Sequence, residues 1–328
     1  MTLSVAAKFR RENGLDVSWQ DTLVCNGGKQ VIYNALAATL NEGDEVIVPA
    51  PYWVSYPEMV ELCGGTAKIV ACSAEDAFKL TPAALDQAIT PSTRWLILNS
   101  PSNPTGAVYS REELQALAQV VLQHPHVLVL ADDIYEHLLF DGQTFHTLAQ
   151  VEPRLAPRVL TMNGVSKAYA MTGWRIGFAT GPRWLLEAME KLQGQQTSGA
   201  SAISQQAAIA ALNGPQAFIQ QSRAVFEARR DWVVAFLNAT PGLECLKPSG
   251  AFYAFASCAG LLGRTTPAGT LLRTDEDVAH ALLDEANVAV VHGSAFGLAP
   301  YLRIAYALDE DSLRQACEAI RRFCLATR

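Results

Sequence analysis

The chain has 328 residues, of which 50% are hydrophobic and 17% are charged, and its formal net charge is −7. This is enough apolar chain to bury one large core and a second, smaller one. The acidic balance provides no basic surface for nucleic acid or anionic lipid. No uninterrupted apolar run reaches the roughly 18 residues that a membrane span needs, and the N-terminal residues lack the long apolar segment of a signal peptide. We therefore expect a cytoplasmic protein with no nucleic-acid or membrane partner.

The cysteines form neither a CxxC pair nor a cluster with histidine. Because their number is odd, they cannot all pair within the chain. We expect free thiols in a reducing compartment, and no metal site. The seven are Cys25, Cys63, Cys72, Cys245, Cys258, Cys317 and Cys324.

Short apolar, β-branched segments recur through the first half of the chain and predict strands. Amphipathic stretches at residues 29–40 and 111–122 lie between them and predict helices. Strands this uniformly apolar are typical of a mostly parallel sheet covered on both faces, so we expect a three-layer α/β domain. The predicted strands cover residues 45–49, 67–72, 95–98, 127–130, 159–162 and 176–180.

The pattern changes toward the C-terminus. A long helical region at 204–237 predicts a single interdomain helix, and the segments after it predict a small α+β domain. We therefore divide the chain into a large domain, 1–215, and an interdomain helix with a small C-terminal domain, 216–328. The predicted small-domain elements are an extended segment at 250–255, turns at 261–270, a helix at 275–286, strands at 288–291 and 301–305, and a closing helix from Asp309.

The most informative segment is NGVSKAYAMTGWRIGF, residues 163–178. It places Lys167 just beyond a predicted strand, where open α/β sheets bind their ligands, and Arg175 follows. A lysine amine can condense with an aldehyde, and a guanidinium can bind a phosphate with two parallel hydrogen bonds. Pyridoxal 5′-phosphate (PLP) is a cofactor that needs both. In isolation, a Ser-Lys dipeptide is more often a surface lysine in a loop, and the other residues of the set reverse that preference.

Asp132 and Tyr135 follow the predicted strand 127–130 and should lie at the same edge of the sheet. A carboxylate there can pair with a protonated pyridine nitrogen, and a tyrosine can hydrogen-bond the ring oxygen of PLP. Asn103 lies in the proline-rich turn NSPSNPTG, which would hold its amide toward a ligand. The alternatives are a helix cap for the aspartate and a rigid turn without further function for the asparagine.

Three further positions suit the same ligand. Gly28 and Lys29 open a predicted helix, where backbone N–H groups can approach a phosphate, although a plain Gly-Gly turn would look the same. Trp53 offers an aromatic face for stacking, although most such residues are core. Arg303 lies between apolar neighbours in a predicted strand and could bind a substrate carboxylate; a structural ion pair is the alternative.

Together these segments resemble a known family. GGKQ, PYWVSYPEM, NSPSNPTGAVY, DDIYEHL, NGVSKAYAMTGWRIG, PSGAFY and LRIAYA occur in the order found in class I aminotransferases of the fold type I PLP enzymes. The resemblance runs along essentially the whole chain and is strongest to the bacterial aspartate aminotransferase subgroup. It implies a PLP-transferase large domain with a smaller C-terminal domain, and a homodimer with active sites at the subunit interface.

The resemblance also implies roles. Lys167 matches the Schiff-base lysine, Asp132 the partner of the pyridine nitrogen, and Asn103 and Tyr135 the contacts to the ring oxygen. Trp53 matches the stacking aromatic, and Arg303 the arginine that binds the substrate α-carboxylate. The positions that match the phosphate site are Gly28, Lys29 through its backbone, Ser166 and Arg175.

The implied reaction moves an amino group between an amino acid, aspartate or a similar one, and a 2-oxo acid such as 2-oxoglutarate. Three alternatives remain open at this point. They are an aromatic or alanine aminotransferase, a PLP lyase of the same fold, and an N-terminally truncated PLP-binding protein with little activity.

Three departures from the family pattern stand out. Many relatives have a phosphate-binding serine where this chain has Gly164, and Ser166 supplies the nearby hydroxyl. His292 replaces a proline, and we expect it to be structural. Relatives also have about 70 residues ahead of the position of Met1, so residues 1–14 would lie in the middle of a helix. In the family, that preceding segment supplies an arm around the neighbouring subunit, part of the small domain, and a tyrosine that reaches the partner's phosphate.

Overall fold

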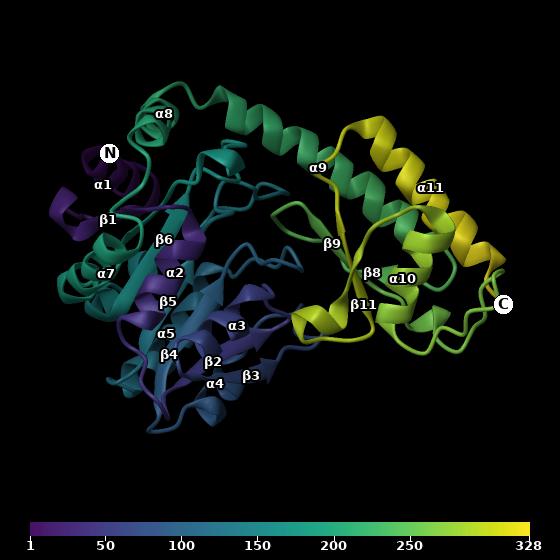
Figure 1. Ribbon diagram of the computed structural model, residues 1–328, viewed down its shortest axis with the longest axis horizontal. Coiled ribbons are helices and arrows are strands. Elements are labelled where there is room, and N and C mark those ends of the chain that lie inside the picture. The colour runs from purple at the N-terminus through teal and green to yellow at the C-terminus, as the bar shows by residue number, and fades with distance from the viewer.

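The computed structural model describes residues 1–328 and contains two β-sheets (Figure 1). We call the part around the seven-stranded sheet the large lobe, and the part around the four-stranded sheet the small lobe. Each lobe has its own hydrophobic core, because each sheet buries apolar side chains against helices. None of the helices combines the length and the apolar composition that crossing a bilayer would require.

The sheet of the large lobe has the strand order β1-β7-β6-β5-β4-β2-β3. Neighbouring strands from β6 to β3 pair in parallel, and only β7 runs antiparallel to its neighbours β6 and β1. The prediction of a mostly parallel sheet is therefore confirmed. The strands are β1 (Thr22–Cys25), β2 (Glu45–Ala50), β3 (Thr66–Ala71), β4 (Thr93–Asn99), β5 (Leu128–Asp132), β6 (Val159–Gly164) and β7 (Gly177–Thr180).

Side chains alternate between the two faces of this sheet, as the period of a strand requires. In β5, Val129 packs into the core on one face, while Leu128 and Leu130 pack into the core on the other. α1, α4, α5, α6 and α8 cover the first face, and α2, α3 and α7 cover the second, which confirms the three-layer prediction. The helices are α1 (Thr2–Asn13), α2 (Gly28–Ala37), α3 (Ser55–Leu62), α4 (Pro82–Ala88), α5 (Arg111–Gln123), α6 (Leu148–Val151), α7 (Arg183–Gln196) and α8 (Ala202–Asn213).

Two details of the large lobe differ from expectation. β1 was not predicted, because it contributes only four residues between a short 3₁₀ turn and the glycines of α2. The edge strand β3 is not covered on both faces: Ile69 is 42% exposed. An edge strand has one neighbouring strand instead of two, so it is less completely enclosed.

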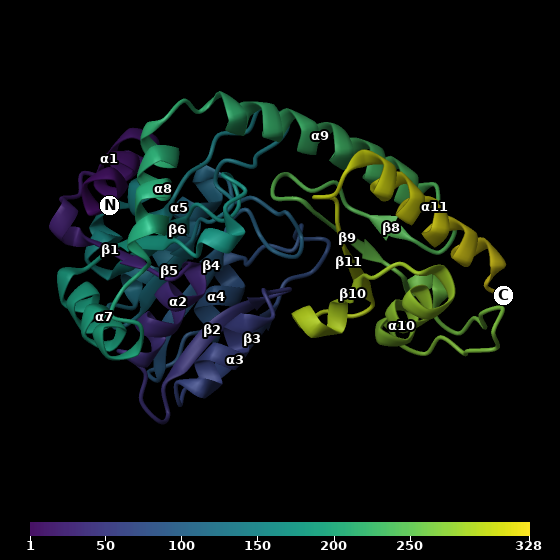
Figure 2. The ribbon, with the colours of Figure 1, turned by 45° about the horizontal axis from the view of Figure 1, so that its top comes forward.

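The long helix predicted at 204–237 is wrong. The structure has α8 (Ala202–Asn213) and then a separate helix, α9 (Ala217–Asn238). Gly214 ends α8 in an extended conformation, and Pro215 lacks the N–H that would continue the helix. α9 runs from the large lobe across to the small lobe, where it lies beside α11 (Figures 1 and 2).

The small lobe is an antiparallel sheet of order β10-β11-β9-β8, packed against α9, α10 and α11. The predicted helix 275–286, the strand 301–305 and the closing helix are confirmed. The strand predicted at 288–291 is displaced, because Asn287 ends α10 in a left-handed conformation and Val288 then packs into the core before pairing begins. The elements are β8 (Glu244–Cys245), β9 (Tyr253–Ser257), α10 (Asp275–Ala286), β10 (Val291–His292), β11 (Tyr301–Ala305) and α11 (Glu310–Ala326).

Candidate active site

A cavity of about 330 Å³ lies at the carboxyl ends of the parallel strands, between the two lobes. Asn99 and Asp132, the last residues of β4 and β5, face it from the large lobe, and Tyr253 and Arg303 face it from the small lobe. All ten residues predicted from the sequence line this cavity. They are Gly28, Lys29, Trp53, Asn103, Asp132, Tyr135, Ser166, Lys167, Arg175 and Arg303.

Lys167 lies in the loop that follows β6 and extends its amine over two aromatic rings. Its Nζ is 5.5 Å from the ring centre of Tyr135 and 5.6 Å from that of Phe252. Burial lowers the pKa of the Lys167 amine, the charges of Arg303 and Arg175 lower it further, and Asp132 opposes the shift. A lower pKa leaves more of the amine neutral, which is the form that attacks a carbonyl carbon.

Asp132 is only 3% exposed. The hydroxyl of Tyr56 donates a hydrogen bond of 2.6 Å to its Oδ2, and the backbone N–H of Ile134 donates one of 3.3 Å to its Oδ1. Burial raises the pKa of this carboxyl to about 6, although the hydrogen bond from Tyr56 and the charge of Lys167 act in the opposite direction. Asp132 is thus a buried carboxylate that would gain from a cationic partner, which is not the environment of a simple helix cap.

The two lobes meet in the cavity through polar contacts. The hydroxyls of Tyr135 and Tyr253 are 2.8 Å apart, and Nη1 of Arg303 donates a hydrogen bond of 3.1 Å to Oδ1 of Asn103. The backbone N–H of Asn103 donates to the side chain of Asn99 at 2.8 Å, which fixes the proline-rich turn at the end of β4. Asn103 is therefore held from both lobes.

Arg303 has no carboxylate partner in the structure, so the alternative of a structural ion pair is not supported. Its Cζ lies 4.9 Å from the ring centres of both Tyr253 and Phe296. Its Nε is buried without a hydrogen-bond partner. A buried donor without an acceptor costs free energy. A bound anion would supply the acceptor and the opposite charge that this guanidinium lacks.

The opposite end of the cavity is built from glycines and Arg175. Gly27 has a positive φ of 83°, and a Cβ there would lie 2.2 Å from Nη2 of Arg175. A Cβ on Gly28 would lie 2.8 Å from Cε of Met162. Only glycine therefore allows the start of α2 and the Arg175 side chain to approach this closely.

Ser166 is buried beside the same end of the cavity. Lys29 is exposed, and its Nζ lies 4.9 Å from the ring centre of Trp53. The Lys29 ammonium therefore lies at the cavity itself, whereas the sequence suggested a contribution mainly through the backbone.

Two tyrosines of the site were missed from the sequence. Tyr56 binds Asp132, and Tyr253 binds Tyr135. Tyr56 lies three residues beyond Trp53, a spacing that places side chains on one side of a helix, and the two rings contact edge-to-face at 5.4 Å. That spacing was the available signal for Tyr56; Tyr253 had none beyond its place in the PSGAFY segment.

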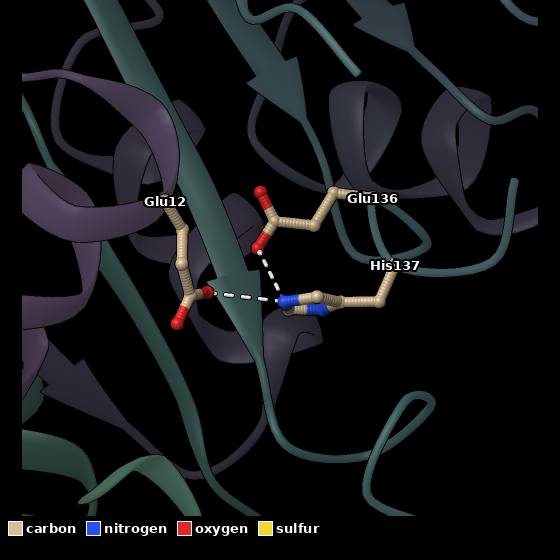
Figure 3. Close-up of side chains that lie close together, drawn as sticks. All are labelled: Glu12, Glu136 and His137. Atoms are coloured by element: carbon tan, nitrogen blue, oxygen red, sulfur yellow. Dashed lines mark hydrogen bonds and ion pairs between the residues drawn. The ribbon is translucent and has the colours of Figure 1, made fainter. Parts of the chain in front are cut away.

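A second polar cluster lies outside the cavity, and we call it the Lys8 cluster: Lys8, Glu12, Glu136 and His137. Nε2 of His137 lies 3.0 Å from Glu12 and 3.6 Å from Glu136 (Figure 3). Three of these side chains could together ligate a metal ion. However, the Lys8 ammonium forms an ion pair with Glu136, and a second cation would be repelled there. We therefore assign the cluster to structure.

His292 also has a structural contact. Its Nδ1 lies 2.6 Å from the hydroxyl of Ser294, which donates in turn to Oδ1 of Asp275 at 3.0 Å. Since the hydroxyl proton is used on Asp275, Nδ1 is the donor to Ser294. The contact links the turn after β10 to the start of α10.

Comparison with known proteins identifies the family of this chain. The family model for class I and II aminotransferases matches residues 3–320. A probable aspartate/prephenate aminotransferase of Rhizobium leguminosarum bv. phaseoli is 59% identical over 98% of this chain and 80% of its own length. An aspartate/prephenate aminotransferase of Cereibacter sphaeroides is 54% identical over the same shares. The crystal structure of an aspartate aminotransferase from Rhizobium meliloti superposes with a TM-score of 0.97 at 52% identity, covering 100% of this chain and 82% of that one.

The chain therefore belongs to the class I and II aminotransferases, a family that uses PLP, and it is an aspartate-aminotransferase-like transaminase. The fold predicted from the sequence and the predicted family are both confirmed.

Proposed function

We propose that this chain binds PLP in the cavity through Lys167 and transfers the amino group of aspartate, or of a similar amino acid, to a 2-oxo acid such as 2-oxoglutarate. The observation that carries the proposal is the charge of the cavity. Four cationic side chains line it, Lys29, Lys167, Arg175 and Arg303, against the single carboxylate of Asp132. Such a surplus of positive charge suits a phosphate together with substrate carboxylates.

PLP fits the residues that line the cavity. The missing Cβ of Gly27 lets Arg175 lie close to the start of α2, and Ser166 lines the same cavity, so these groups would hold the phosphate of PLP. The carboxylate of Asp132, which has hydrogen bonds but no ion-pair partner, would suit a protonated pyridine nitrogen. When bound, PLP supplies an aldehyde and an electron-poor ring that stabilises negative charge on the substrate Cα.

The side chains around the ring position would hold and move protons. The Lys167 amine would hold the aldehyde group of PLP and would take the proton from the substrate Cα. Asp132 would accept a hydrogen bond from the protonated pyridine nitrogen, which would keep the ring electron-poor. Tyr135 and Asn103 would hydrogen-bond the ring oxygen, and Trp53 would stack on the ring.

Substrate binding follows from the two remaining cations. Arg303, which lines the cavity, has no carboxylate partner and lies 4.9 Å from two aromatic ring centres, would bind the α-carboxylate. Lys29 then remains for a second carboxylate, which favours a dicarboxylic amino acid such as aspartate. The relatives named aspartate/prephenate aminotransferases support prephenate as a second candidate amino acceptor.

Steady-state assays test the substrate assignment. We expect kcat/KM to be higher for aspartate than for alanine or tyrosine, with 2-oxoglutarate or prephenate as acceptor. Lys29→Met should raise KM for aspartate by about tenfold, as expected for the loss of one charged hydrogen bond, and leave alanine unchanged. Lys191→Met, at an exposed lysine of α7, is the matched control. Equal rates with aspartate and alanine would contradict the assignment.

Three further points are part of the proposal. The resemblance to the family supports a homodimer, which sedimentation of the purified protein would test against a mass of one chain. The division into a large domain, 1–215, and an interdomain helix with a small domain, 216–328, stays a prediction. So does the cytoplasmic location.

A further inference from the structure

One face of the small-lobe sheet combines aromatic rings with Arg303. Phe255 of β9 lies directly opposite Arg303 of β11, and directly opposite residues of an antiparallel pair point to the same face. Tyr301 shares that face, because it lies two residues before Arg303. The residues between them, such as Leu302, point to the other face and pack into the small-lobe core. The aromatic face is thus turned away from that core.

A phenylalanine of the large lobe completes this face. Phe78 follows β3 and is 9% exposed, and it belongs to one cluster with Phe255 and Phe296 of the small lobe. Its ring meets Phe255 at 5.7 Å and Tyr301 at 5.5 Å, edge-to-face in both cases. Edge-to-face pairs have a preferred geometry, so the contact fixes orientation as well as burying surface.

The segment that carries Phe78 is anchored in the large lobe. The backbone N–H of Phe78 donates to the carbonyl of Ser73 at 2.8 Å, and that of Leu80 donates to the hydroxyl of Tyr109 at 2.8 Å. Ala77 and Phe78 both adopt positive φ angles, 53° and 59°, which are uncommon for residues with a Cβ. Because such backbone costs free energy, it persists where surrounding contacts compensate for it.

The cluster leads directly to Arg303. Phe255 contacts Phe296 at 6.2 Å, and the Phe296 ring lies 4.9 Å from Cζ of Arg303. The carbonyl of Phe296 also accepts a hydrogen bond of 3.0 Å from the backbone N–H of Tyr52, next to Trp53. Phe296 is therefore held by the large lobe on one side, and it supports the guanidinium on the other.

We propose that Phe78 is a positioning residue for the substrate carboxylate. Through Phe255 and Phe296, it holds the aromatic face of the small lobe so that Arg303 meets Asn103 and presents its guanidinium to the cavity. This inference rests on the proposed role of Arg303 in carboxylate binding. A residue that served only the core would affect stability and leave carboxylate affinity unchanged.

The test measures binding of maleate, an unreactive dicarboxylate, to the PLP-loaded protein by calorimetry. Phe78→Ala should weaken maleate binding by about tenfold and raise KM for the amino acid similarly, with kcat changed by less than about threefold; this size is typical of coupling between contacting groups. Phe78→Leu, which keeps the apolar volume, should show a smaller weakening and replaces the alanine variant if that variant does not fold.

Two controls separate the possible outcomes. Phe236→Ala removes a ring that packs on Trp232 in the small lobe away from Arg303, and it should lower the melting temperature without changing maleate affinity. Arg303→Lys should abolish most of the maleate binding. If wild-type binding does not depend on Arg303, the proposed function fails, and this inference fails with it. If binding depends on Arg303 but neither Phe78 variant changes it, only the inference about Phe78 is overturned.

Discussion

Two buried carboxylates four residues apart, Asp132 and Glu136, have opposite surroundings. Both are almost fully buried, at 3% and 4% exposure. Glu136 forms an ion pair with Lys8 and accepts a hydrogen bond of 2.6 Å from Nδ2 of Asn13. Asp132 faces the cavity with a tyrosine as its side-chain partner. A buried charge that the chain itself neutralises serves the fold, whereas one left without a counter-ion is typical of a functional site.

The overall charge of the Lys8 cluster differs from that of the cavity in the same way. In the Lys8 cluster, Lys8 pairs with Glu12 and Glu136, and Glu12 also pairs with Arg11, so the charges balance without a ligand. The cavity has the opposite composition, since its four cationic side chains face only Asp132. We therefore expect substitutions in the cavity to change activity, and substitutions in the Lys8 cluster to change stability.

The largest effect is expected at Asp132. Asp132→Asn removes the negative charge that would hold the pyridine nitrogen protonated, and kcat should fall by roughly 10³-fold, the scale of a lost electrostatic contact in an active site. The Tyr56 hydroxyl can still donate to the amide oxygen, so the protein should remain folded. Steady-state transamination with circular dichroism as the folding control measures both. If kcat stays within a factor of a few of the wild-type value, Asp132 does not have the proposed role in catalysis.

Lys8→Met should produce the largest loss of stability. It leaves Glu136 buried without its cation, which costs about 3–5 kcal/mol of the free energy of unfolding. The double variant Lys8→Met/Glu136→Gln should recover part of this loss, because the orphaned charge is removed as well. Urea unfolding of the three proteins measures the effect. Retained stability together with lost turnover would mean that the Lys8 cluster belongs to the active site after all.

The stability of the protein freed of cofactor should depend on pH through Asp132. Since folding raises the pKa of Asp132 to about 6 from 3.8, its ionisation opposes folding. This cost is absent below about pH 4, grows as the pH rises toward 6, and is complete above it, where it amounts to roughly 3 kcal/mol. Asp132→Asn should therefore stabilise the cofactor-free protein at pH 7.5 and have no effect near pH 4. Urea unfolding at the two pH values measures the gain. An equal gain in the free energy of unfolding at both pH values would contradict the prediction.

Glu12 should show the opposite behaviour on a smaller scale. Burial alone would raise its pKa, but the hydrogen bond from His137 and the charge of Lys8 outweigh burial and lower the pKa to about 2. Its ionised form therefore stabilises the fold above about pH 4.5, and this stabilisation is lost as the pH falls toward 2. Glu12→Gln should cost about 1 kcal/mol at pH 7, because the pair is partly exposed to solvent, and less at pH 3. A cost that does not shrink in acid would contradict the charge-based explanation.

The sequence was most informative where a buried strand ends. Apolar runs marked β4, β5 and β6, and parallel strands bring their carboxyl ends to one edge, so Asn103, Asp132 and Lys167 could be expected to meet. The sequence alone did not decide the role of Arg303 in the small lobe, because a lone arginine in a strand can also form a structural ion pair. The structure separates the two roles, because the hydrogen-bond partner of Arg303 is the amide oxygen of Asn103 and not a carboxylate.

Other features could not be obtained from local patterns. The break between α8 and α9 depends on Gly214 and Pro215, whose effect the helical periodicity on either side concealed. The Lys8 cluster joins side chains from α1 and from the turn after β5, and nothing in either segment indicates the other. Such contacts are decided by tertiary packing, which residue spacing does not encode.

The central claim is that the unmatched charge of the cavity holds PLP on Lys167, and reduction with borohydride tests it most directly. The purified protein loaded with PLP is reduced, digested and analysed by mass spectrometry, since a lysine bonded to an aldehyde is trapped by reduction. The expected result is a pyridoxyl-phosphate mass on the peptide that contains Lys167, with Lys8 and Lys29 unmodified. Modification of another lysine, or of none, would contradict the claim.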